Sequence, residues 1–275
     1  MNHKRNVLTI AGSDSSGGAG IQADIKTFEA LNVYSACVIS AVTSQNTLGV
    51  QSVYELPTSV LESQLKAVLA DIEFSAIKIG MLKSKEHIEV VARLLKRYMP
   101  PNIVVDPVMI SSSGFRLQDE AATQILIDEL FPLTRLITPN IPEAAYLLKC
   151  EPDWVSHHAA EACKLLIENF SLNAVLLKGG HTEKNYCIDM LACKNSDNPD
   201  LVFTSYHYQK LAKTNTHGTG CTLASAIAAC LAKGYELRSA VDTAGKFLQL
   251  ALKNADYQMV GKGIGPLNHH DAAAT

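Results

Sequence analysis

The sequence has no apolar run that approaches the length of a membrane-spanning helix, which is about 20 residues. It also has no excess of basic residues, because 24 lysines and arginines stand against 27 acidic residues and give a formal net charge of −3 at pH 7. A chain without a basic surplus lacks the electrostatic footprint of a nucleic-acid-binding protein. We therefore expect neither a membrane nor a nucleic acid as a partner.

Paired cysteines are absent as well, since none of the seven cysteines forms a CxxC pair and their number is odd. This pattern argues against both a zinc ribbon and a disulfide framework. The N-terminal segment has basic residues before an apolar stretch that is too short for the core of a signal peptide. We expect a reduced, cytoplasmic protein. The sequence also shows no internal repeat, linker or low-complexity segment, so we expect a single domain over residues 1–275.

Short β-branched runs alternate with amphipathic or alanine-rich stretches along most of the chain. Most of the β-branched runs are nearly continuous in apolar residues, which is typical of strands buried on both faces of a parallel sheet. The repeated strand–helix order predicts a three-layer α/β/α fold with a mostly parallel central sheet and right-handed crossovers. Residues 186–208 instead predict a small hairpin insertion around the turn Asn195–Asp200, and the last third predicts helices. The expected strands are 6–12, 34–45, 75–80, 102–109, 135–140 and 173–180, and the expected helices are 21–32, 57–72, 84–98, 119–130 and 157–170.

Polar segments follow the predicted strands at the places where ligands of α/β proteins usually bind. The first, AGSDSSGGAGIQAD at residues 11–24, has neither the Lys-Ser/Thr of a Walker A loop nor the GxGxxG spacing of a dinucleotide site. Its glycines let the backbone approach a ligand closely, and it carries the carboxylates of Asp14 and Asp24. The alternative interpretation is a tight strand–helix turn in which Asp14 acts as a local cap.

Two amides, Gln45 and Asn46, end the second long strand. An amide donates and accepts hydrogen bonds along one edge, which suits a heteroaromatic ring that carries a ring nitrogen and an amino group. A simple turn explains the same residues, so both interpretations stay open.

Three further strand ends carry residues suited to phosphate and metal. Asp106 follows a strand in VVDPVM, and Lys178 closes another in LLKGGH. Asn140 and Glu143 stand three residues apart at the start of a predicted helix, so they share one face and can order a hydrated Mg²⁺. A helix cap explains this pair equally well.

The segment Gly218-Thr219-Gly220-Cys221 precedes a run of small apolar residues that predicts a helix. The first N–H groups of a helix lack intrahelical partners and carry partial positive charge, and glycines let them turn toward a phosphoryl oxygen. We expect the same field to lower the pKa of Cys221, which makes this thiol a candidate general base toward a substrate hydroxyl. The alternative, a purely structural cysteine, suits Cys230 better, because it lies among alanines.

The set of segments TIAGSDSSGGAGIQAD, SQNTLGVQSV, KIGML, DPVM, TPNIPEA, LLKGGH, KTNTHGTGCTLASA and VGKGIGP resembles the hydroxymethylpyrimidine/phosphomethylpyrimidine kinases of thiamine biosynthesis. The resemblance runs in order from about Leu8 to His270, and it implies the ribokinase-like fold. The Gly-Thr-Gly-Cys turn is specific to this branch, because the related sugar kinases carry Gly-Ala-Gly-Asp with the aspartate as base. The segments after His181 and at the C-terminus depart from the family pattern.

The resemblance implies ATP-dependent phosphorylation of 4-amino-5-hydroxymethyl-2-methylpyrimidine and then of the resulting monophosphate, with Mg²⁺ as a cofactor and a homodimer as the assembly. Gln45 would hydrogen-bond the pyrimidine, with Cys221 as the base and Gly218, Thr219 and Gly220 as the anion hole. The other implied site residues are Asp24, Gly12, Val42 and Met81 around the pyrimidine, Lys178, Thr216 and Asp106 on the nucleotide side, and Asn140 and Glu143 for Mg²⁺ through water.

Three other functions stay open at this point: a pyridoxal kinase on the same scaffold, a non-catalytic pyrimidine-binding sensor, and a nicotinamide-dependent oxidoreductase, which lacks its fingerprint. Among the histidines, His269 and His270 lack ligand spacing, so we expect them to be solvated. His217 lies inside the anion-binding turn, where it can touch phosphate, and Lys262 can either reach phosphate or cap a helix.

Overall fold

The computed structural model describes residues 5–109, 120–179, 182–183, 186–195, 200–211, 215–257 and 260–272. Its described strands form one 10-stranded sheet in the order β10-β9-β7-β6-β5-β4-β1-β2-β3, with β8 paired to β9 beside this path. Pairing is parallel from β2 through β1, β4, β5 and β6 to β7, and antiparallel at both flanks. The strands are β1 (Asn6–Asp14), β2 (Tyr34–Asn46), β3 (Gly49–Glu55), β4 (Ala76–Ile79), β5 (Ile103–Val105), β6 (Leu136–Ile137), β7 (Ala174–Leu177), β8 (Thr182–Glu183), β9 (Tyr186–Lys194) and β10 (Leu201–Gln209).

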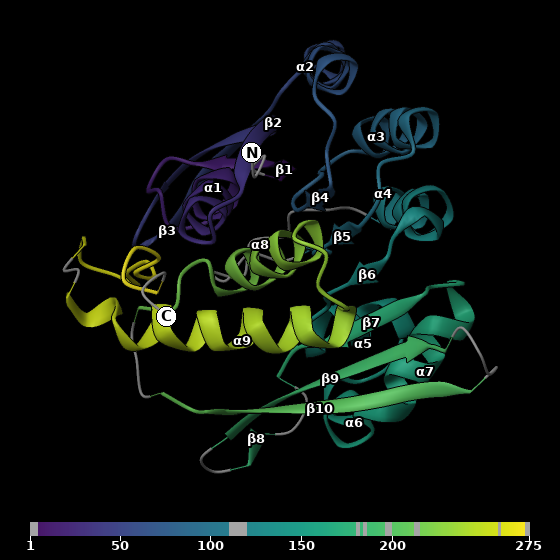
Figure 1. Ribbon diagram of the computed structural model, residues 1–275, viewed down its shortest axis with the longest axis vertical. Helices are drawn as coiled ribbons and strands as arrows, with labels where there is room; N and C mark the ends of the chain where they lie inside the picture. The colour runs from purple at the N-terminus through teal and green to yellow at the C-terminus, as the bar shows by residue number, and fades with distance from the viewer. Residues whose placement is uncertain are drawn as a thin grey trace.

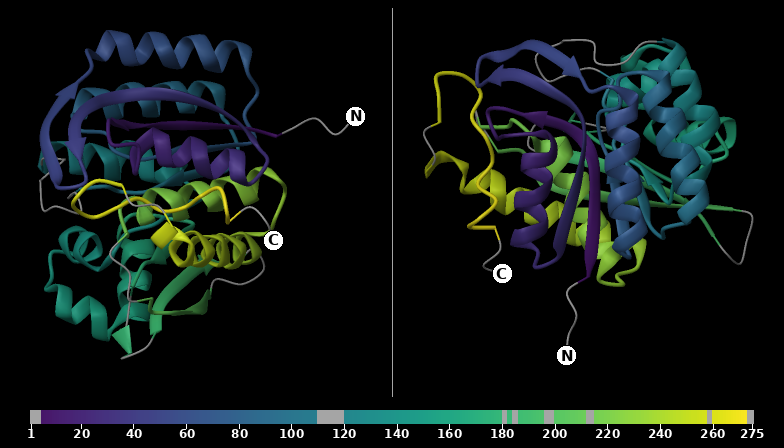
Figure 2. Two further views of the ribbon diagram at one scale, coloured as in Figure 1. Left: turned by 90° about the vertical axis from the view of Figure 1, so that its left-hand side faces the viewer. Right: turned by 90° about the horizontal axis from the view of Figure 1, so that it is seen from above.

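Helices cover both faces of the sheet, which gives the predicted three layers (Figure 1, Figure 2). One face packs against α2 (Thr58–Asp71), α3 (Lys85–Tyr98), α4 (Glu120–Ile125), α5 (Ile141–Leu148), α6 (Pro152–His157) and α7 (Ala159–Asn169). The other packs against α1 (Gly20–Ala30), α8 (Thr219–Ala232) and α9 (Leu237–Lys253). Successive residues of a strand point to opposite faces. Val7 therefore packs in the core beneath α1, α8 and α9, whereas Leu8 packs in the core on the side of α2 to α7.

Helix α8 is buried on all sides from Thr222 to Ala232. Its small side chains, mostly alanines, allow α1 and α9 to pack closely around it while it covers the middle of the sheet. A helix that is apolar all round belongs in the interior of a protein. This packing holds the N-terminal end of α8, where Cys221 lies, at a fixed place beside the strand ends.

Several elements differ from the expected ones. Strand β2 turns back into β3 as an antiparallel hairpin, and α6 is an additional short helix. The expected helix 119–130 is an α-helix only to Ile125 and continues as one π turn to Leu130. The predicted insertion is confirmed as the antiparallel pair β9–β10, although residues 196–199 of its turn lie outside the described residues, as does His181.

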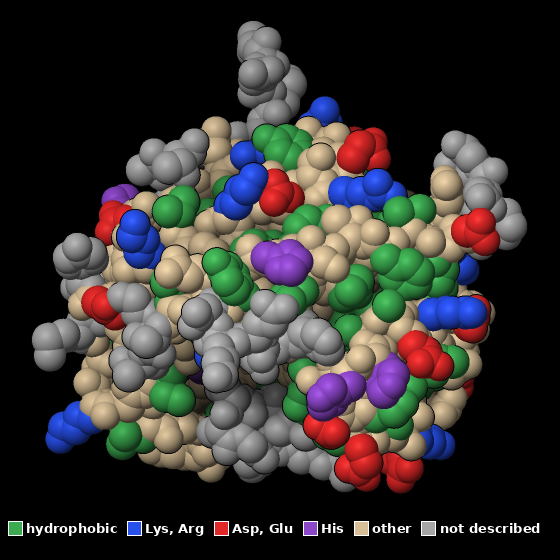
Figure 3. Space-filling model, turned by 90° about the horizontal axis from the view of Figure 1, so that it is seen from below, with side chains coloured by type: hydrophobic (Ala, Val, Ile, Leu, Met, Phe, Trp, Pro, Cys, Tyr) green, Lys and Arg blue, Asp and Glu red, His purple; other side chains and the backbone are tan. Residues whose placement is uncertain are grey.

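The surface carries charges of both signs, and Figure 3 shows lysine or arginine interspersed with aspartate or glutamate on one face. Within the described residues, no helix is both long and apolar enough to cross a membrane.

Candidate active site

The N-terminal turn of α8 begins at Gly218, which has φ +88° and ψ 9°. A Cβ atom at this position would overlap the backbone oxygen of Gly18, so the close approach of the two loops requires glycine. No side chain caps the helix, and therefore the N–H groups of its first turn that follow Thr219 can bind an anion. Thr216 is exposed just before this turn, and its carbonyl accepts a hydrogen bond from the N–H of Thr219 at 3.4 Å.

Cys221 is the third residue of α8 and is partly exposed. The backbone N–H of Gly20, the first residue of α1, favours the thiolate form of its sulfur and so acts to lower the pKa of Cys221. Burial nevertheless raises the pKa of the Cys221 thiol to about 11, because it outweighs the nearby Lys78 ammonium, while the Asp24 and Asp106 carboxylates also favour the neutral thiol. The prediction of a lowered pKa is therefore wrong for the ligand-free protein.

Near Cys221, Lys78 of β4 and Asp24 of α1 form a buried ion pair. Both side chains are 0% exposed, and the lysine nitrogen lies 2.9 Å from each carboxylate oxygen. Asp24 also accepts hydrogen bonds from Thr9 at 2.6 Å and from Ser225 at 2.7 Å, so its oxygens are fully used.

This arrangement corrects the expectation that Asp24 surrounds the pyrimidine: its carboxylate lies below the surface and balances Lys78. Burial alone would lower the pKa of Lys78, but Asp24 and the other negative groups raise it. Sequence reasoning missed Lys78, although a lysine inside the apolar run SAIKIG was a signal, because a buried lysine requires a partner.

A second ion pair joins the ends of β5 and β7. The Nζ atom of Lys178 donates to Oδ1 of Asp106 at 2.7 Å, and the Thr138 hydroxyl donates to the same oxygen at 3.0 Å. Burial alone would lower the pKa of Lys178 and raise that of Asp106, but each charge stabilises the other and reverses both shifts. A Cβ atom built on Gly220 would lie 3.3 Å from this lysine nitrogen, so the ammonium borders the anion-binding turn.

Asn140 and Glu143 form a capping box at the start of α5. The Asn140 side chain accepts a hydrogen bond from the Glu143 N–H, and the Glu143 carboxylate accepts one from the Asn140 N–H, each at 2.8 Å. The helix-cap interpretation is therefore confirmed. Burial raises the pKa of Glu143 to about 7; Lys178 opposes this shift, whereas Asp106 adds to it.

The residues fit a hydrated Mg²⁺ rather than a directly ligated one. Among the described residues, no group of three His, Cys, Asp or Glu side chains can hold a metal ion alone. Asp106 and Glu143 provide two carboxylates near one lysine, and oxygen donors of this kind suit Mg²⁺, which keeps several of its waters. The capping box already uses the Asn140 oxygen, which favours a contact through water.

The expected pyrimidine side lies at the ends of β1 and β2. A groove of about 450 Å³ is lined by Gln45 and Val42, and Val42 is 43% exposed. Met81 is nearly buried, and a Cβ atom built on Gly12 would lie 2.5 Å from its methyl carbon, so a side chain on Gly12 would displace it. Of the four residues expected around the pyrimidine here, Gln45 and Val42 line the groove, whereas Gly12 and Met81 are buried against each other and do not line it.

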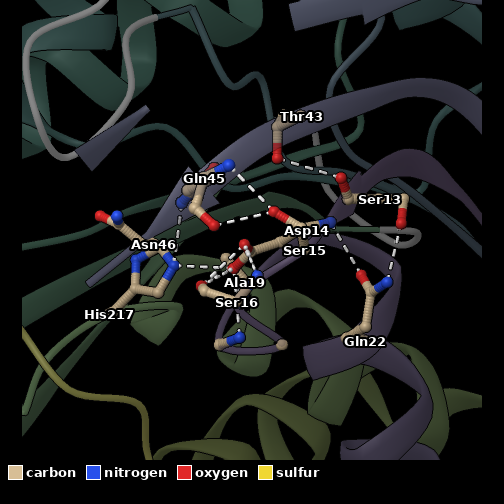
Figure 4. A network of polar contacts seen from close by, with 12 residues as sticks. Ser13, Asp14, Ser15, Ser16, Ala19, Gln22, Thr43, Gln45, Asn46 and His217 are labelled. Atoms are coloured by element: carbon tan, nitrogen blue, oxygen red, sulfur yellow. Dashed lines mark hydrogen bonds and ion pairs between the residues drawn. The ribbon is translucent and has the colours of Figure 1, made fainter. Parts of the chain in front are cut away.

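The Nε2 atom of His217 points toward this region. It lies 2.8 Å from Oδ2 of Asp14 and 3.0 Å from Nε2 of Gln45 (Figure 4). Asp14 also accepts hydrogen bonds from the N–H groups of Gly18 and Ala19, which confirms the tight strand–helix turn, although these groups precede α1 and no side chain caps that helix.

Two minor expectations have opposite outcomes. His269 was expected to be solvated, but it is 4% exposed and hydrogen-bonded to the Thr222 hydroxyl at 2.9 Å. Burial lowers the pKa of His269 to about 4, with the charge of Lys26 acting in the same direction. His270 is exposed, as predicted.

An uncapped helix N-terminus, a lysine and two carboxylates lie together at the ends of the parallel strands, an arrangement that can bind phosphate groups and Mg²⁺ as phosphotransferases do. Comparison with known proteins gives the family. A family model described as phosphomethylpyrimidine kinase matches residues 14–268, and the chain belongs to this family. The fold is accordingly the ribokinase-like fold that the resemblance implied.

Individual relatives agree with this assignment. The hydroxymethylpyrimidine/phosphomethylpyrimidine kinase of Salmonella typhimurium is 42% identical over 277 residues, which cover 97% of this chain and 98% of that protein. The crystal structure of phosphomethylpyrimidine kinase from Clostridium difficile is 42% identical, with a TM-score of 0.73 and coverage of 89% of this chain and 98% of that one. Pyridoxal kinase from Staphylococcus aureus in complex with AMP-PCP is 31% identical, with a TM-score of 0.86 and coverage of 98% and 95%. Membership of this family argues against a nicotinamide-dependent oxidoreductase.

Proposed function

We propose that the protein transfers a phosphoryl group from ATP to the CH₂OH group of 4-amino-5-hydroxymethyl-2-methylpyrimidine and then phosphorylates the resulting monophosphate. One observation carries this proposal: the uncapped turn at Gly218–Cys221 borders the Lys178 ammonium and lies at the same sheet edge as Gln45. The names of the full-length relatives support the same pair of reactions.

Charge neutralisation and positioning supply most of the catalysis in phosphoryl transfer. The N–H groups of the α8 turn and the Lys178 ammonium can bind the transferred phosphate, while Thr216 lies on the nucleotide side. Asp106 and Glu143 would hold Mg²⁺ through water, and the ion would neutralise charge on the phosphates of ATP. The complex of a structural relative with AMP-PCP supports ATP as the donor.

The first transfer requires a base, because the alcohol must lose its proton as its oxygen attacks phosphorus. We assign this role to Cys221, whose thiolate would take the proton as the new O–P bond forms and the bond to ADP breaks. The second transfer needs no base, since a phosphate monoester already carries about −1.5 to −2 charge near pH 7. The two reactions therefore share the anion-binding turn and differ in their need for the sulfur.

This assignment predicts different pH dependences for the two reactions. With a pKa of about 11, the thiol is almost entirely protonated at neutral pH, and the thiolate fraction grows as the pH rises. We expect kcat/KM for the pyrimidine alcohol to rise by up to about tenfold per pH unit between pH 7 and 10. The same measurement on the monophosphate is the control, and it should stay nearly level because Lys178, with its raised pKa, remains charged. Equal slopes for both substrates would remove Cys221 from the base role.

Product analysis tests the proposed function itself. The protein is incubated with MgATP and the pyrimidine alcohol, and the products are identified by mass spectrometry. We expect the monophosphate first and the diphosphate later. Tight binding of the alcohol without any phosphorylated product would instead indicate a pyrimidine-binding sensor.

A pyridoxal kinase is the second candidate, because solved pyridoxal kinases resemble this structure with TM-scores of 0.84 to 0.86. Competition between pyridoxal and the pyrimidine alcohol, with kcat/KM determined for each, separates the two. We expect the pyrimidine to be preferred, in line with the higher identity to the pyrimidine kinases.

The proposal includes a cytoplasmic homodimer. All seven cysteines are free, which suits a reducing compartment. The edge strand β3 exposes Tyr54 to 66%, and an exposed edge of this kind is suited to pairing with a second copy. Sedimentation analysis of the purified protein tests the dimer.

A further inference from the structure

Three side chains from distant parts of the chain meet at one nitrogen atom. The Nε2 atom of His217, from the loop before α8, lies 2.8 Å from Oδ2 of Asp14 and 3.0 Å from the side-chain amide of Gln45 (Figure 4). Asp14 ends β1, and Gln45 lies near the end of β2 and lines the groove. A ring nitrogen carries at most one hydrogen, so this meeting point restricts how the three groups are oriented.

Asp14 is an ionised acceptor. Besides His217, its carboxylate accepts hydrogen bonds from the Ser16 N–H at 2.8 Å, the Ser16 hydroxyl at 2.7 Å, the Gly18 N–H at 3.1 Å and the Ala19 N–H at 2.8 Å. A carboxylate that accepts several N–H bonds is held in its charged form. Burial alone would raise the pKa of Asp14, but the hydrogen bonds it accepts hold that pKa well below its usual range.

The charge on Asp14 determines where the imidazole proton lies. A carboxylate has only lone pairs to offer, so a contact of 2.8 Å requires a hydrogen on Nε2 of His217. This holds for the Nε2-protonated neutral ring and for the imidazolium alike. When Nε2 of His217 carries a hydrogen, it cannot accept a hydrogen bond from the Gln45 amide. The NH₂ group of Gln45 would then face another donor.

A half-turn about the last side-chain bond of Gln45 exchanges its oxygen and its nitrogen and removes this conflict. The imidazole N–H then donates to both Asp14 and the Gln45 oxygen. The backbone of Gln45 stays in place during this half-turn, because Ser15 makes two hydrogen bonds to it. The Ser15 hydroxyl donates to the Gln45 carbonyl at 2.8 Å and accepts from the Gln45 N–H at 2.9 Å.

We propose that Asp14 and His217 are positioning residues that turn the Gln45 amide oxygen toward the imidazole, so that its NH₂ group faces the groove and selects a ligand with a hydrogen-bond acceptor. On the proposed function, on which this step rests, the acceptor is a ring nitrogen of the pyrimidine. A buried donor that meets no acceptor loses the free energy of the hydrogen bond and of its desolvation, which makes such a contact selective. Gly18 supports the imidazole: a Cβ atom built on it would lie 2.5 Å from Cδ2 of His217, so Gly18→Ala displaces the ring.

The tautomer is tested first, without any substrate. Two-bond ¹H–¹⁵N correlation spectra of the intact protein, with His217 assigned by loss of its signals in His217→Gln, report the protonation of each ring nitrogen. We expect a protonated Nε2 from pH 6 to 9. A non-protonated Nε2 at pH 8 would overturn the proposal, whether or not the protein is a kinase.

The selectivity is tested with the pyrimidine alcohol and two analogues, each with one ring nitrogen replaced by CH. We expect wild-type protein to bind one analogue about tenfold more weakly than the alcohol. His217→Ala and Gly18→Ala should reduce this ratio to about twofold or less. His87→Ala, at another buried histidine that contacts the Leu56 carbonyl at 2.9 Å, is the matched control and should keep the wild-type ratio.

A ratio that is unchanged in both His217→Ala and Gly18→Ala would contradict the positioning role. If wild-type protein does not bind the alcohol at all, the proposed function fails, and the NMR result still decides the orientation of the network.

Discussion

On the phosphate side of the site, Asp106 and Lys178 follow directly on buried strands and Cys221 lies in the first turn of a buried helix. On the pyrimidine side, Asp14, His217 and Gln45 meet from three separate chain segments. The first side is held by ion pairs set into the core. The second is held by hydrogen bonds between side chains at the ends of strands and in a loop. A site built this way can keep its phosphate chemistry constant while the ring-binding side changes through a few orienting contacts.

The largest expected effect comes from breaking the buried Lys78–Asp24 ion pair on the phosphate side. Lys78→Met leaves Asp24 as an unpaired buried charge, so we expect the free energy of unfolding to fall by about 3–5 kcal/mol. Lys246→Met is the matched control, because Lys246 pairs with Asp242 at 2.6 Å on the surface, and it should cost no more than about 0.5 kcal/mol. Urea unfolding measures both; similar losses would show that the buried pair has no special role.

Gly218→Ala should come next, because it disturbs the turn that both reactions share. The substitution strains a backbone with φ +88° and pushes against Gly18, so we expect kcat to fall by about 100-fold or more with both substrates. Gly234→Ala is a matched control near the other end of α8, with φ +89° and no atom within 4 Å of the added carbon. Loss of activity in both variants would indicate general strain rather than damage to the anion-binding turn.

Asn140→Ala should have the smallest effect. Loss of the cap on α5 should lower the free energy of unfolding by about 1 kcal/mol. Asn140→Ser should retain most of the wild-type stability, because serine also caps helices. If Asn140 only caps the helix, Asn140→Ser keeps the wild-type dependence of the rate on Mg²⁺ concentration. A raised Mg²⁺ requirement in Asn140→Ser would assign the amide to the metal as well.

The sequence predicts the two sides of the site unequally well. The three layers and the residues at strand ends follow from apolar runs and from the polar residues that end them, so Asp106, Lys178 and the Gly218–Cys221 turn were found at one sheet edge. The capping box was open to two interpretations, because the same spacing suits a metal and a helix start. Local patterns were sufficient for these features.

Contacts between distant segments could not be predicted in this way. Lys78 pairs with a residue 54 positions away, and His217 contacts Asp14 across 203 positions, so no spacing in the sequence indicates either partner. The pKa of Cys221 was predicted with the wrong sign because the helix terminus is visible in the sequence, whereas the burial that outweighs it depends on the packed fold. Burial also reversed the expectation for His269.

Cys221→Ala tests the central claim most directly. The variant is assayed with saturating MgATP on the pyrimidine alcohol and on its monophosphate, and kcat is determined for each. Loss of a general base typically costs about 10²–10⁴-fold, so we expect a drop of at least 100-fold with the alcohol and less than about fivefold with the monophosphate. Equal losses with the two substrates would contradict the account and leave Cys221 a structural residue of the turn.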